Sequence, residues 1–383
     1  MRWRELGVMA VLYRPGNMLL QWHITERCNL RCAHCYQSSF ADDEMDYIGL
    51  LAVLEQFKEL LISWKRQEDP VGVRGHLTVT GGEPFLRPDF MDLLRTLFAN
   101  RGLFTFAILT NGSFIDHAAA SRLKKLTPSF VQVSMEGGRE THDRIRGPGT
   151  FDRAVSGVRR LVKEGVRTFI SFTAHRDNYL EFPVVVDIAR RLKVARVWAD
   201  RFIPPVSGSS RADDVQTPCT LSPLETLHFF RLMHQARGEK TMGNWFRLKQ
   251  TEVAMHRGIQ FLVGGGVPYR CTAGDSLICI LPNGDVYPCR RMPVKIGNVL
   301  ETPLAKIYHG SDILHALRDG DRIGDGCRKC FFARACRGGL RCLSYALSGS
   351  PFEADPGCWL SERARASMGN PGMPDSEYAS QIF

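Results

Sequence analysis

Three cysteines lie within eight residues and form the first group of side chains able to do unusual chemistry. Cys28, Cys32 and Cys35 are separated by three and then two residues, so one tight loop can direct three thiolates at a single point. A tetrahedral zinc site usually takes four ligands in pairs from two segments. Three thiolates instead match an iron–sulfur cubane in which one iron has no protein ligand and can bind a substrate or cofactor. The loop therefore predicts a catalytic cluster, with a structural metal loop or clustered core cysteines as the alternative.

The aromatic Tyr36 follows this triplet, and the whole stretch resembles the signature of the radical S-adenosylmethionine (SAM) enzymes. The resemblance implies that Cys28, Cys32 and Cys35 hold three irons of a 4Fe–4S cluster whose fourth iron chelates the amino and carboxylate groups of SAM. It also implies that an electron from the cluster cleaves SAM to methionine and a 5′-deoxyadenosyl radical, which abstracts hydrogen from the substrate. The protein's share is then to bind, orient and exclude water.

The tetrapeptide Gly81-Gly82-Glu83-Pro84 follows the next predicted strand and resembles the superfamily's SAM-binding segment. Two glycines let the backbone approach a ligand, and a carboxylate or carbonyl accepts hydrogen bonds from the methionyl ammonium. Taken alone, such a tetrapeptide is usually an ordinary turn at the end of a strand. Its place one strand–helix unit after the cysteine loop favours the SAM-binding interpretation.

Three further polar residues are predicted to contact SAM. Asn111 and Ser134 end the next two predicted strands, where they can bind the SAM carboxylate or ribose, or else satisfy their own turns. Ser134 to Gly137 and His142 to Gly147 resemble a serine–acidic–glycine and a His-Asp-x-x-Arg-Gly pattern of peptide-modifying members. Arg146 is the third predicted contact, and an ion pair on a helix surface is the alternative.

Eight more cysteines occur beyond Tyr269, enough to ligate two complete clusters. Their spacing resembles the SPASM domain, a C-terminal module with auxiliary iron–sulfur clusters. The resemblance implies two interleaved ligand sets, which would stabilise a loop-rich domain with little core of its own. The first set is Cys271, Cys279, Cys289 and Cys342, and the second is Cys327, Cys330, Cys336 and Cys358.

One departure from the SPASM pattern concerns Cys342. Five residues separate Cys336 from Cys342 where the family usually has three, so the spacing leaves open which cluster takes Cys342. Two zinc sites are the alternative to the two clusters, because a Cys-x-x-Cys pair such as Cys327 and Cys330 also suits zinc.

A predicted hairpin over Ile280 to Tyr287, with Asn-Gly at its turn, holds Cys279 and Cys289 at its two ends. Arg290 and Arg291 follow directly. A cationic pair at this place suits an acidic or carboxylate-bearing substrate, or else balances the negative charge of a cluster.

Strands and helices alternate six times ahead of the SPASM-like region, which predicts parallel strands with helices outside. Six units are too few for the eight-stranded closed barrel, so we expect an α/β fold with an open, partial (β/α)6 barrel. The functional side chains should lie at the carboxyl ends of the strands. The predicted strands are 18–24, 76–80, 104–109, 130–134, 167–174 and 194–200.

The expected domain organisation follows from these motifs. It comprises an N-terminal extension (1–17), the barrel (18–236), a bridging segment (237–268), a small α+β SPASM domain with two auxiliary clusters (269–362) and a C-terminal tail (363–383).

Composition limits the function classes. The chain has 383 residues, is 44% hydrophobic and carries a net charge of +10 without a long basic block, which is weak evidence for nucleic acid. The early apolar run Leu6 to Tyr13 is too short to span a bilayer, and no signal peptide pattern precedes it, so a cytoplasmic protein is expected. Twelve cysteines then favour metal or redox chemistry over disulfides.

SPASM-type radical enzymes mostly modify ribosomally made peptides, so a peptide maturase is the leading expectation. Its partners would be SAM, three 4Fe–4S clusters, a precursor peptide with or without a separate recognition protein, and a reductant such as flavodoxin or ferredoxin. Tetrapyrrole side-chain processing is the alternative, because porphyrin propionates suit a basic pocket equally well. A sulfatase-maturase role is less favoured, since Arg290 stands where that subgroup has an aspartate. An electron carrier leaves the SAM motifs unexplained.

Overall fold

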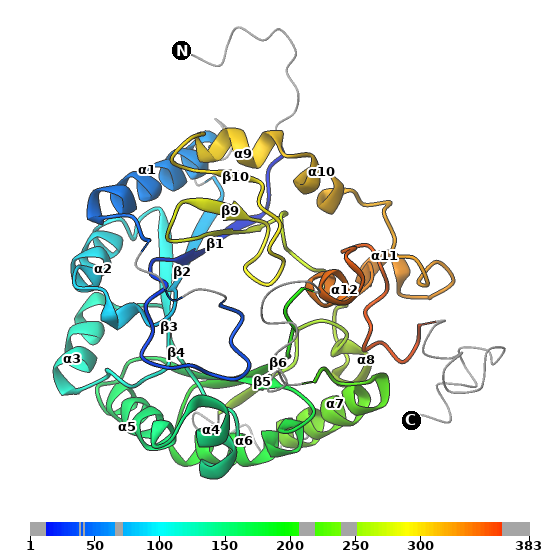
Figure 1. Ribbon diagram of the computed structural model, residues 1–383, viewed down its shortest axis with the longest axis horizontal. Coiled ribbons are helices and arrows are strands. Elements are labelled where there is room, and N and C mark those ends of the chain that lie inside the picture. The colour runs from blue at the N-terminus through cyan, green and yellow to red at the C-terminus, as the bar shows by residue number, and fades with distance from the viewer. Residues whose placement is uncertain are drawn as a thin grey trace, which may run out of the picture.

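The computed structural model describes residues 13–37, 40, 43–65, 72–206, 219–238 and 251–361. Ten strands form one sheet in the order β10-β9-β8-β1-β2-β3-β4-β5-β6-β7, and the helices lie outside the curved sheet (Figure 1). The predicted N-terminal apolar run, apart from Tyr13, and the predicted C-terminal tail lie outside the described residues.

The six predicted barrel strands are present and pair in parallel in sequence order, which confirms the partial barrel. Each strand alternates an apolar side chain packed beneath the helices with one that faces the inside of the barrel. In β1, for example, Leu20 and Trp22 are fully buried in the core while Gln21 faces the other way. The strands are β1 Asn17–His23, β2 Arg74–Thr80, β3 Phe104–Thr110, β4 Val131–Ser134, β5 Thr168–Ala174 and β6 Arg196–Arg201.

In the described part of the chain, seven helices cover the outside of these strands, and several begin at side-chain caps. Asp46 accepts a hydrogen bond from the Gly49 N–H at the start of α1, and Ser222 with Glu225 forms a capping box at the start of α7. The helices are α1 Tyr47–Ser63, α2 Phe90–Ala99, α3 His117–Leu126, α4 Arg139–Arg146, α5 Thr150–Lys163, α6 Phe182–Arg191 and α7 Pro223–Arg237, with 3-10 turns η2 Pro84–Leu86 and η3 Tyr179–Glu181.

Both edges of the six-stranded sheet are extended by later segments. β7 (Glu252–Ala254), from the segment expected only to bridge the domains, pairs in parallel with β6. On the other edge β8 (Leu277–Ile280) pairs in parallel with β1. β8 and β9 (Asp285–Tyr287) form the predicted hairpin, and β10 (Gly297–Asn298) completes the sheet. The cysteine-rich C-terminal region is therefore joined to the barrel through the main sheet.

Short helices of the C-terminal region continue the outer ring. In Figure 1, α9 and α10 follow α1 around the molecule, and α11 and α12 lie between α10 and the α7–α8 side. These helices are α8 Phe261–Gly264, α9 Leu304–Gly310, α10 Asp312–Arg318, α11 Ala333–Cys336 and α12 Arg341–Ser348.

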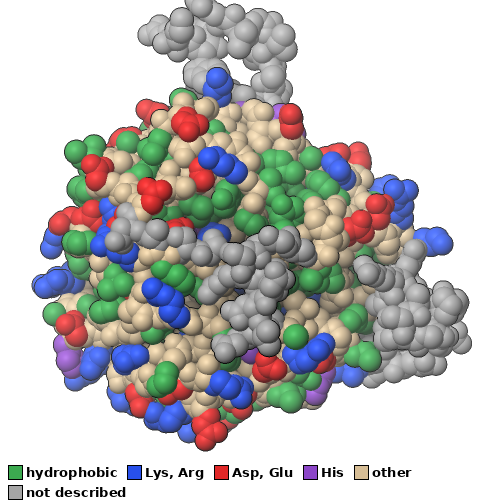
Figure 2. Space-filling model, in the orientation of Figure 1, with side chains coloured by type: hydrophobic (Ala, Val, Ile, Leu, Met, Phe, Trp, Pro, Cys, Tyr) green, Lys and Arg blue, Asp and Glu red, His purple; other side chains and the backbone are tan. Residues whose placement is uncertain are grey.

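Basic and acidic side chains are interspersed over the visible face of the molecule (Figure 2), in keeping with the absence of a basic block in the sequence. None of the helices in the described part of the chain is both long enough and apolar enough to cross a membrane.

Candidate functional site

The cysteine loop and the Gly81-Gly82-Glu83 segment pack directly against one another. β1 and β2 continue as a short ladder beyond their ends, with the Gly82 N–H donating to the Thr25 carbonyl and the Glu83 N–H to the Arg27 carbonyl, both at 2.8 Å. A Cβ on Gly82 would lie 2.3 Å from the Arg27 carbonyl oxygen, and Gly81 adopts a φ of 158°. Glycine is therefore required where this segment meets the start of the cysteine loop.

Glu83 is fully buried and joins the ends of β2 and β3. Its carboxylate accepts hydrogen bonds from the Thr110 hydroxyl at 2.8 Å and from the Asn111 N–H at 2.8 Å. Burial raises the pKa of Glu83 to about 7 although these hydrogen bonds oppose the shift. Asn111 in turn donates from its side-chain amide to the side-chain Oδ1 atom of Asn29 in the cysteine loop, at 2.9 Å. The predicted contacts Glu83 and Asn111 thus lie together beside the cysteine loop, and Pro84 starts the 3-10 turn that follows.

The Arg146 side chain, at the end of α4, is only 11% exposed and pairs with a buried carboxylate, so it does not form the surface ion pair that was the alternative. Its guanidinium bonds the Glu136 carboxylate at 2.6 Å and lies 3.9 Å from the Cys32 sulfur. The Glu136 carboxylate also accepts from the Thr173 N–H at 2.9 Å. Burial alone would raise the pKa of Glu136, but Arg146 and then His34 outweigh it and hold the pKa far below its usual range. A fixed positive charge therefore lies beside one thiol of the triplet.

His34 and Glu136 are two members of this group to which the sequence interpretation gave no role. The His34 Nε2 atom lies 3.3 Å from the Glu136 carboxylate, and its ring stacks on His175 at 6.3 Å between centroids. His34 stands between Cys32 and Cys35, and its place inside the triplet was the only available signal. Ser134, the remaining predicted contact, ends β4 opposite Ser171 of β5.

Tyr36 connects the cysteine loop to the C-terminal region. The Arg290 guanidinium lies 4.9 Å from the centre of the Tyr36 ring, and His23 meets the same ring edge-on at 5.9 Å. The Arg290 N–H donates to the side-chain oxygen of Gln21 at 3.2 Å, which ties the end of the hairpin to β1. Arg290, the first of the two adjacent arginines, is thus next to the SAM-signature loop.

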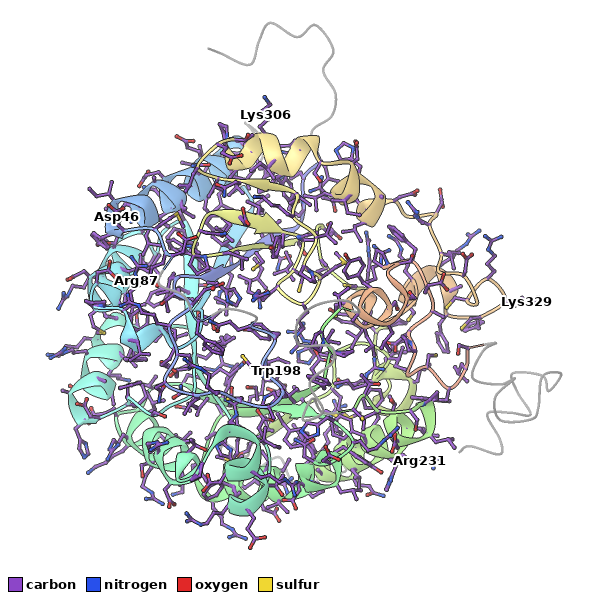
Figure 3. The ribbon with its side chains drawn as sticks, in the orientation of Figure 1. Asp46, Arg87, Trp198, Arg231, Lys306 and Lys329 are labelled. Carbon is purple, nitrogen blue, oxygen red and sulfur yellow. The ribbon has the colours of Figure 1, made fainter. Side chains whose placement is uncertain are left out.

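Arg291 reaches the carboxyl end of β6, where it bonds the buried Asp200 carboxylate at 2.7 Å. Arg257 interacts electrostatically with Asp200 and Arg291 and lies over the Trp198 ring, 5.0 Å from its centre. Figure 3 shows Trp198 inside the ring of strands, whereas Lys329 projects outward from the C-terminal region. At the inner end of β6, Arg291 thus bonds the Asp200 carboxylate and Arg257 interacts electrostatically with it, so two guanidiniums accompany one carboxylate.

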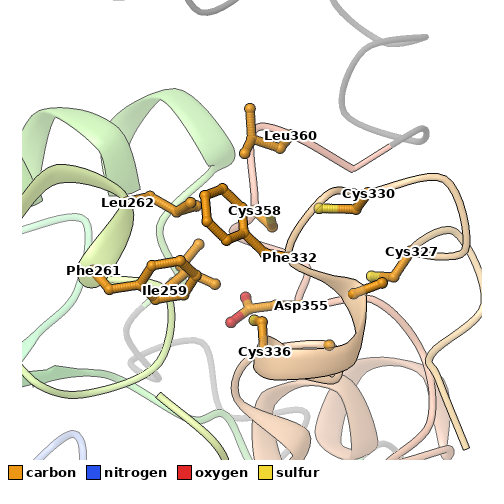
Figure 4. Close-up of a pocket in the computed structure, with 12 residues that line it drawn as sticks. Ile259, Phe261, Leu262, Cys327, Cys330, Phe332, Cys336, Asp355, Cys358 and Leu360 are labelled. Atoms are coloured by element: carbon orange, nitrogen blue, oxygen red, sulfur yellow. The ribbon is translucent and has the colours of Figure 1, made fainter. Parts of the chain in front are cut away.

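The second predicted cysteine set lines one pocket (Figure 4). Cys327, Cys330, Cys336 and Cys358 share it with Asp355 and with an apolar wall that includes Ile259 and Phe332. Burial, followed by the nearby Asp355 carboxylate, raises the pKa of Cys336 to about 12 and that of Cys358 well above its ordinary value. Without a metal these thiols stay protonated, and metal binding must displace their protons.

Electrostatic interactions also link members of the first set. Burial raises the pKa of Cys342, and the Cys289 and then the Cys271 thiol raise it further. Cys289 also contributes to the raised pKa of Cys279, after burial. Cys342, carried on α12, thus interacts with two members of the first set, and its assignment to that set stays a prediction.

The predicted ligand sets are compatible with iron–sulfur clusters. They comprise one set of three thiols and two sets of four, the counts that an open and two fully ligated clusters would need. In the described ranges, no group of three or more His, Cys, Asp or Glu side chains is already arranged to hold a metal ion.

Comparison with known families agrees with this chemistry. Residues 22–188 match the radical SAM superfamily, and residues 271–331 match SPASM, an iron–sulfur cluster-binding domain. The chain is 26% identical to the AdoMet-dependent heme synthase of Methanosarcina barkeri, over 89% of this chain and 95% of that protein. It is 28% identical to the mycofactocin maturase MftC of Mycolicibacterium smegmatis, over 88% and 82%.

A solved structure supports the same fold. The structure of anSMEcpe with bound AdoMet superposes with a TM-score of 0.68 at 18% identity and covers 95% of this chain and 98% of that one. This likeness concerns the fold alone. The two family matches show that the chain is an enzyme of the radical SAM type with a C-terminal SPASM domain.

Proposed function

We propose that this enzyme is a peptide maturase that abstracts hydrogen from a ribosomally made peptide carrying an acidic segment. Cys28, Cys32 and Cys35 hold the SAM-binding cluster, and the two sets of four cysteines hold one auxiliary cluster each. When bound, the cluster and SAM supply the electron and the 5′-deoxyadenosyl group for hydrogen abstraction. A separate recognition protein and a flavodoxin or ferredoxin complete the system.

The residues of this chain bind and orient the two substrates. Gly81 and Gly82 allow the backbone to lie close to the cysteine loop, and Asn111 faces that loop from the end of β3. Ser134 and Arg146 complete the SAM contacts. The Arg146–Glu136 pair fixes a positive charge beside Cys32.

The observation that carries the substrate assignment is the cationic group between the cysteine loop and β6. Arg290 lies against Tyr36, Arg291 bonds Asp200, and Arg257 interacts electrostatically with the same carboxylate. Guanidiniums bind carboxylates through paired hydrogen bonds, and partly desolvated ones do so strongly. These arginines would bind an acidic segment of a peptide, and the peptide residue next to that segment would then lie near the SAM site.

The serine–acidic–glycine and His-Asp-x-x-Arg-Gly segments favour a peptide. In this chain their acidic and arginine members, Glu136 and Arg146, form the buried pair beside Cys32. The similarity to the mycofactocin maturase supports the same class.

The test uses a double Arg290→Gln, Arg291→Gln variant and a short Cys-, Gly- or Ser-rich peptide encoded beside the gene. We expect the wild-type enzyme to change the peptide mass in the presence of SAM and dithionite. The variant should bind the peptide more weakly, with all its iron and its uncoupled SAM cleavage retained. Binding of the peptide to the wild-type enzyme should weaken as the salt concentration rises, because salt screens the attraction between opposite charges. Equal peptide binding by both proteins at low and high salt would refute the acidic-segment assignment.

Tetrapyrrole side-chain processing is the second candidate, and the similarity to the AdoMet-dependent heme synthase favours it. Porphyrin propionates are carboxylates and would bind the same guanidiniums. A titration with iron coproporphyrin III separates the two candidates, because a porphyrin reports its own binding by a shift of its Soret band. A Soret shift followed by SAM-dependent turnover would replace the peptide assignment with this one.

A further inference from the structure

The last two residues of β6 make ion pairs on opposite faces of the sheet. Successive side chains of a strand point to opposite faces. Asp200 accordingly faces the inside and bonds Arg291, two residues after Cys289. Arg201 faces the other way and bonds the Asp355 carboxylate through two nitrogens, at 2.8 and 2.6 Å. One strand end thus reaches both auxiliary cysteine sets.

The Arg201–Asp355 pair is the more deeply enclosed of the two. Its side chains are 2% and 1% exposed. A Cβ on Gly357 would lie 2.1 Å from an Arg201 nitrogen, and a Cβ on Gly339 would lie 2.5 Å from an Asp355 oxygen. Asp355 also accepts from the Leu340 N–H at 3.0 Å and from the Gly357 N–H at 2.9 Å. Glycines leave just enough room for the pair, so its geometry is fixed on both sides.

Asp355 is also part of the wall around the second cysteine set. It lines the pocket together with Cys327, Cys330, Cys336 and Cys358, and Figure 4 shows it among these side chains. The Asp355 carboxylate therefore places a negative charge in the wall of the proposed cluster site.

We propose that the Arg201–Asp355 pair positions the second cysteine set against the end of β6 and sets the reduction potential of the cluster held there. Asp355 fixes the loop through two backbone N–H groups, and Arg201 cancels the carboxylate charge that the pocket would otherwise carry. Buried ion pairs are rarely retained for stability, since apolar residues of similar size often replace them without loss. Charges and hydrogen bonds around a cluster are established determinants of its potential.

The experiment measures the reduction potential of the second auxiliary cluster by EPR-monitored titration of full-length reconstituted protein. Arg201→Met, Asp355→Asn and the double variant that combines them are compared with the wild type. The relevant signal is the one that Cys336→Ala removes. Arg201→Met leaves the carboxylate uncancelled, so the potential should shift to lower values. Asp355→Asn removes the negative charge, so the potential should shift to higher values. The double variant should return close to the wild-type potential. Arg196→Gln, at the opposite end of β6 in an exposed pair with Glu252, is the matched control and should leave the potential unchanged.

Opposite shifts support the proposal, because a purely structural role would move both single variants in the same direction. Shifts of the same sign, or no shift with full iron content, overturn it. If Arg201→Met loses iron, recovery of that iron in the double variant supports charge cancellation, and continued loss overturns it. The proposal rests on the proposed ligand set but not on the substrate. If Cys336→Ala removes no iron signal of the wild type, the ligand set itself is overturned. A failure of the peptide assignment would leave the measured potentials unchanged.

Discussion

Replacing Arg146 by methionine should be strongly destabilising, and the size of the loss follows from the burial of its partner. The Glu136 side chain is 1% exposed and the Arg146 side chain 11% exposed. Removing one partner of a buried pair leaves an uncompensated charge, which typically costs about 3 to 5 kcal/mol. The His34 and Thr173 contacts remain to Glu136, so we expect the loss near the lower end of that range.

The loss should also depend on pH. In the wild type the pKa of Glu136 is held far below its usual range, so the pair contributes stability above the unfolded pKa and loses it as pH falls toward the folded one. In Arg146→Met, burial prevails and the carboxyl takes up a proton more readily. The difference in unfolding free energy between the two proteins should therefore grow from pH 5 to pH 8.

Urea unfolding of the reconstituted proteins under anaerobic conditions measures this difference. Arg139, at the opposite end of the same helix, is the matched control, because it pairs with Asp152 while both side chains are more than half exposed. Arg139→Met should lose nothing measurable. The reasoning is refuted if Arg146→Met is no less stable than Arg139→Met, or if its deficit is the same at both pH values.

Three further outcomes are expected. Gly82→Ala should lose the iron of the first site, about four of about twelve atoms, because its Cβ would meet the Arg27 carbonyl. Gly102→Ala is the control, since nothing lies within 4 Å of its Cβ, and it should keep all the iron. Equal iron contents in the two variants would contradict the close packing at Gly82. Burial raises the pKa of Glu83 in the folded protein to about 7. As pH rises from 4.5 to 7, the wild-type free energy of unfolding should therefore fall relative to that of Glu83→Gln by up to about 3 kcal/mol. Parallel pH profiles of urea unfolding for the two proteins would argue against a buried ionising Glu83. Cys342→Ala should lose the same cluster signal as Cys289→Ala and keep the signal that depends on Cys336; loss of the latter would place Cys342 in the other set.

Local patterns predict the barrel well. The apolar spacing around β1 to β6 and the turn residues after them place six parallel strands and put Gly81, Asn111 and Ser134 at strand ends, as the structure has them. The pairing of β8 with β1 and of β7 with β6 was not foreseen, because three- and four-residue strands carry little periodicity and their partners are distant in sequence.

The site shows the same division between local and long-range information. The cysteine triplet marks its place through spacing, whereas the buried Glu136–Arg146 pair with His34 depends on how α4 packs against the cysteine loop. Glu83 was predicted to face SAM, and that role stays a prediction, but its hydrogen bonds to Thr110 and Asn111 arise only once β2 and β3 are adjacent. Cys342 interacts electrostatically with Cys289 and Cys271 because α12 carries it there, which no count of intervening residues determines, and its place in the first set stays a prediction.

The most direct test of the central claim is the yield of 5′-deoxyadenosine from SAM and dithionite with anaerobically reconstituted enzyme. Wild-type protein that holds about twelve iron atoms, three cubanes of four, should release 5′-deoxyadenosine together with methionine even without substrate. Cys32→Ala should release none while it keeps the iron of the two C-terminal sites. Iron-loaded wild-type protein that leaves SAM intact, or a Cys32→Ala variant that still cleaves it, would contradict the account.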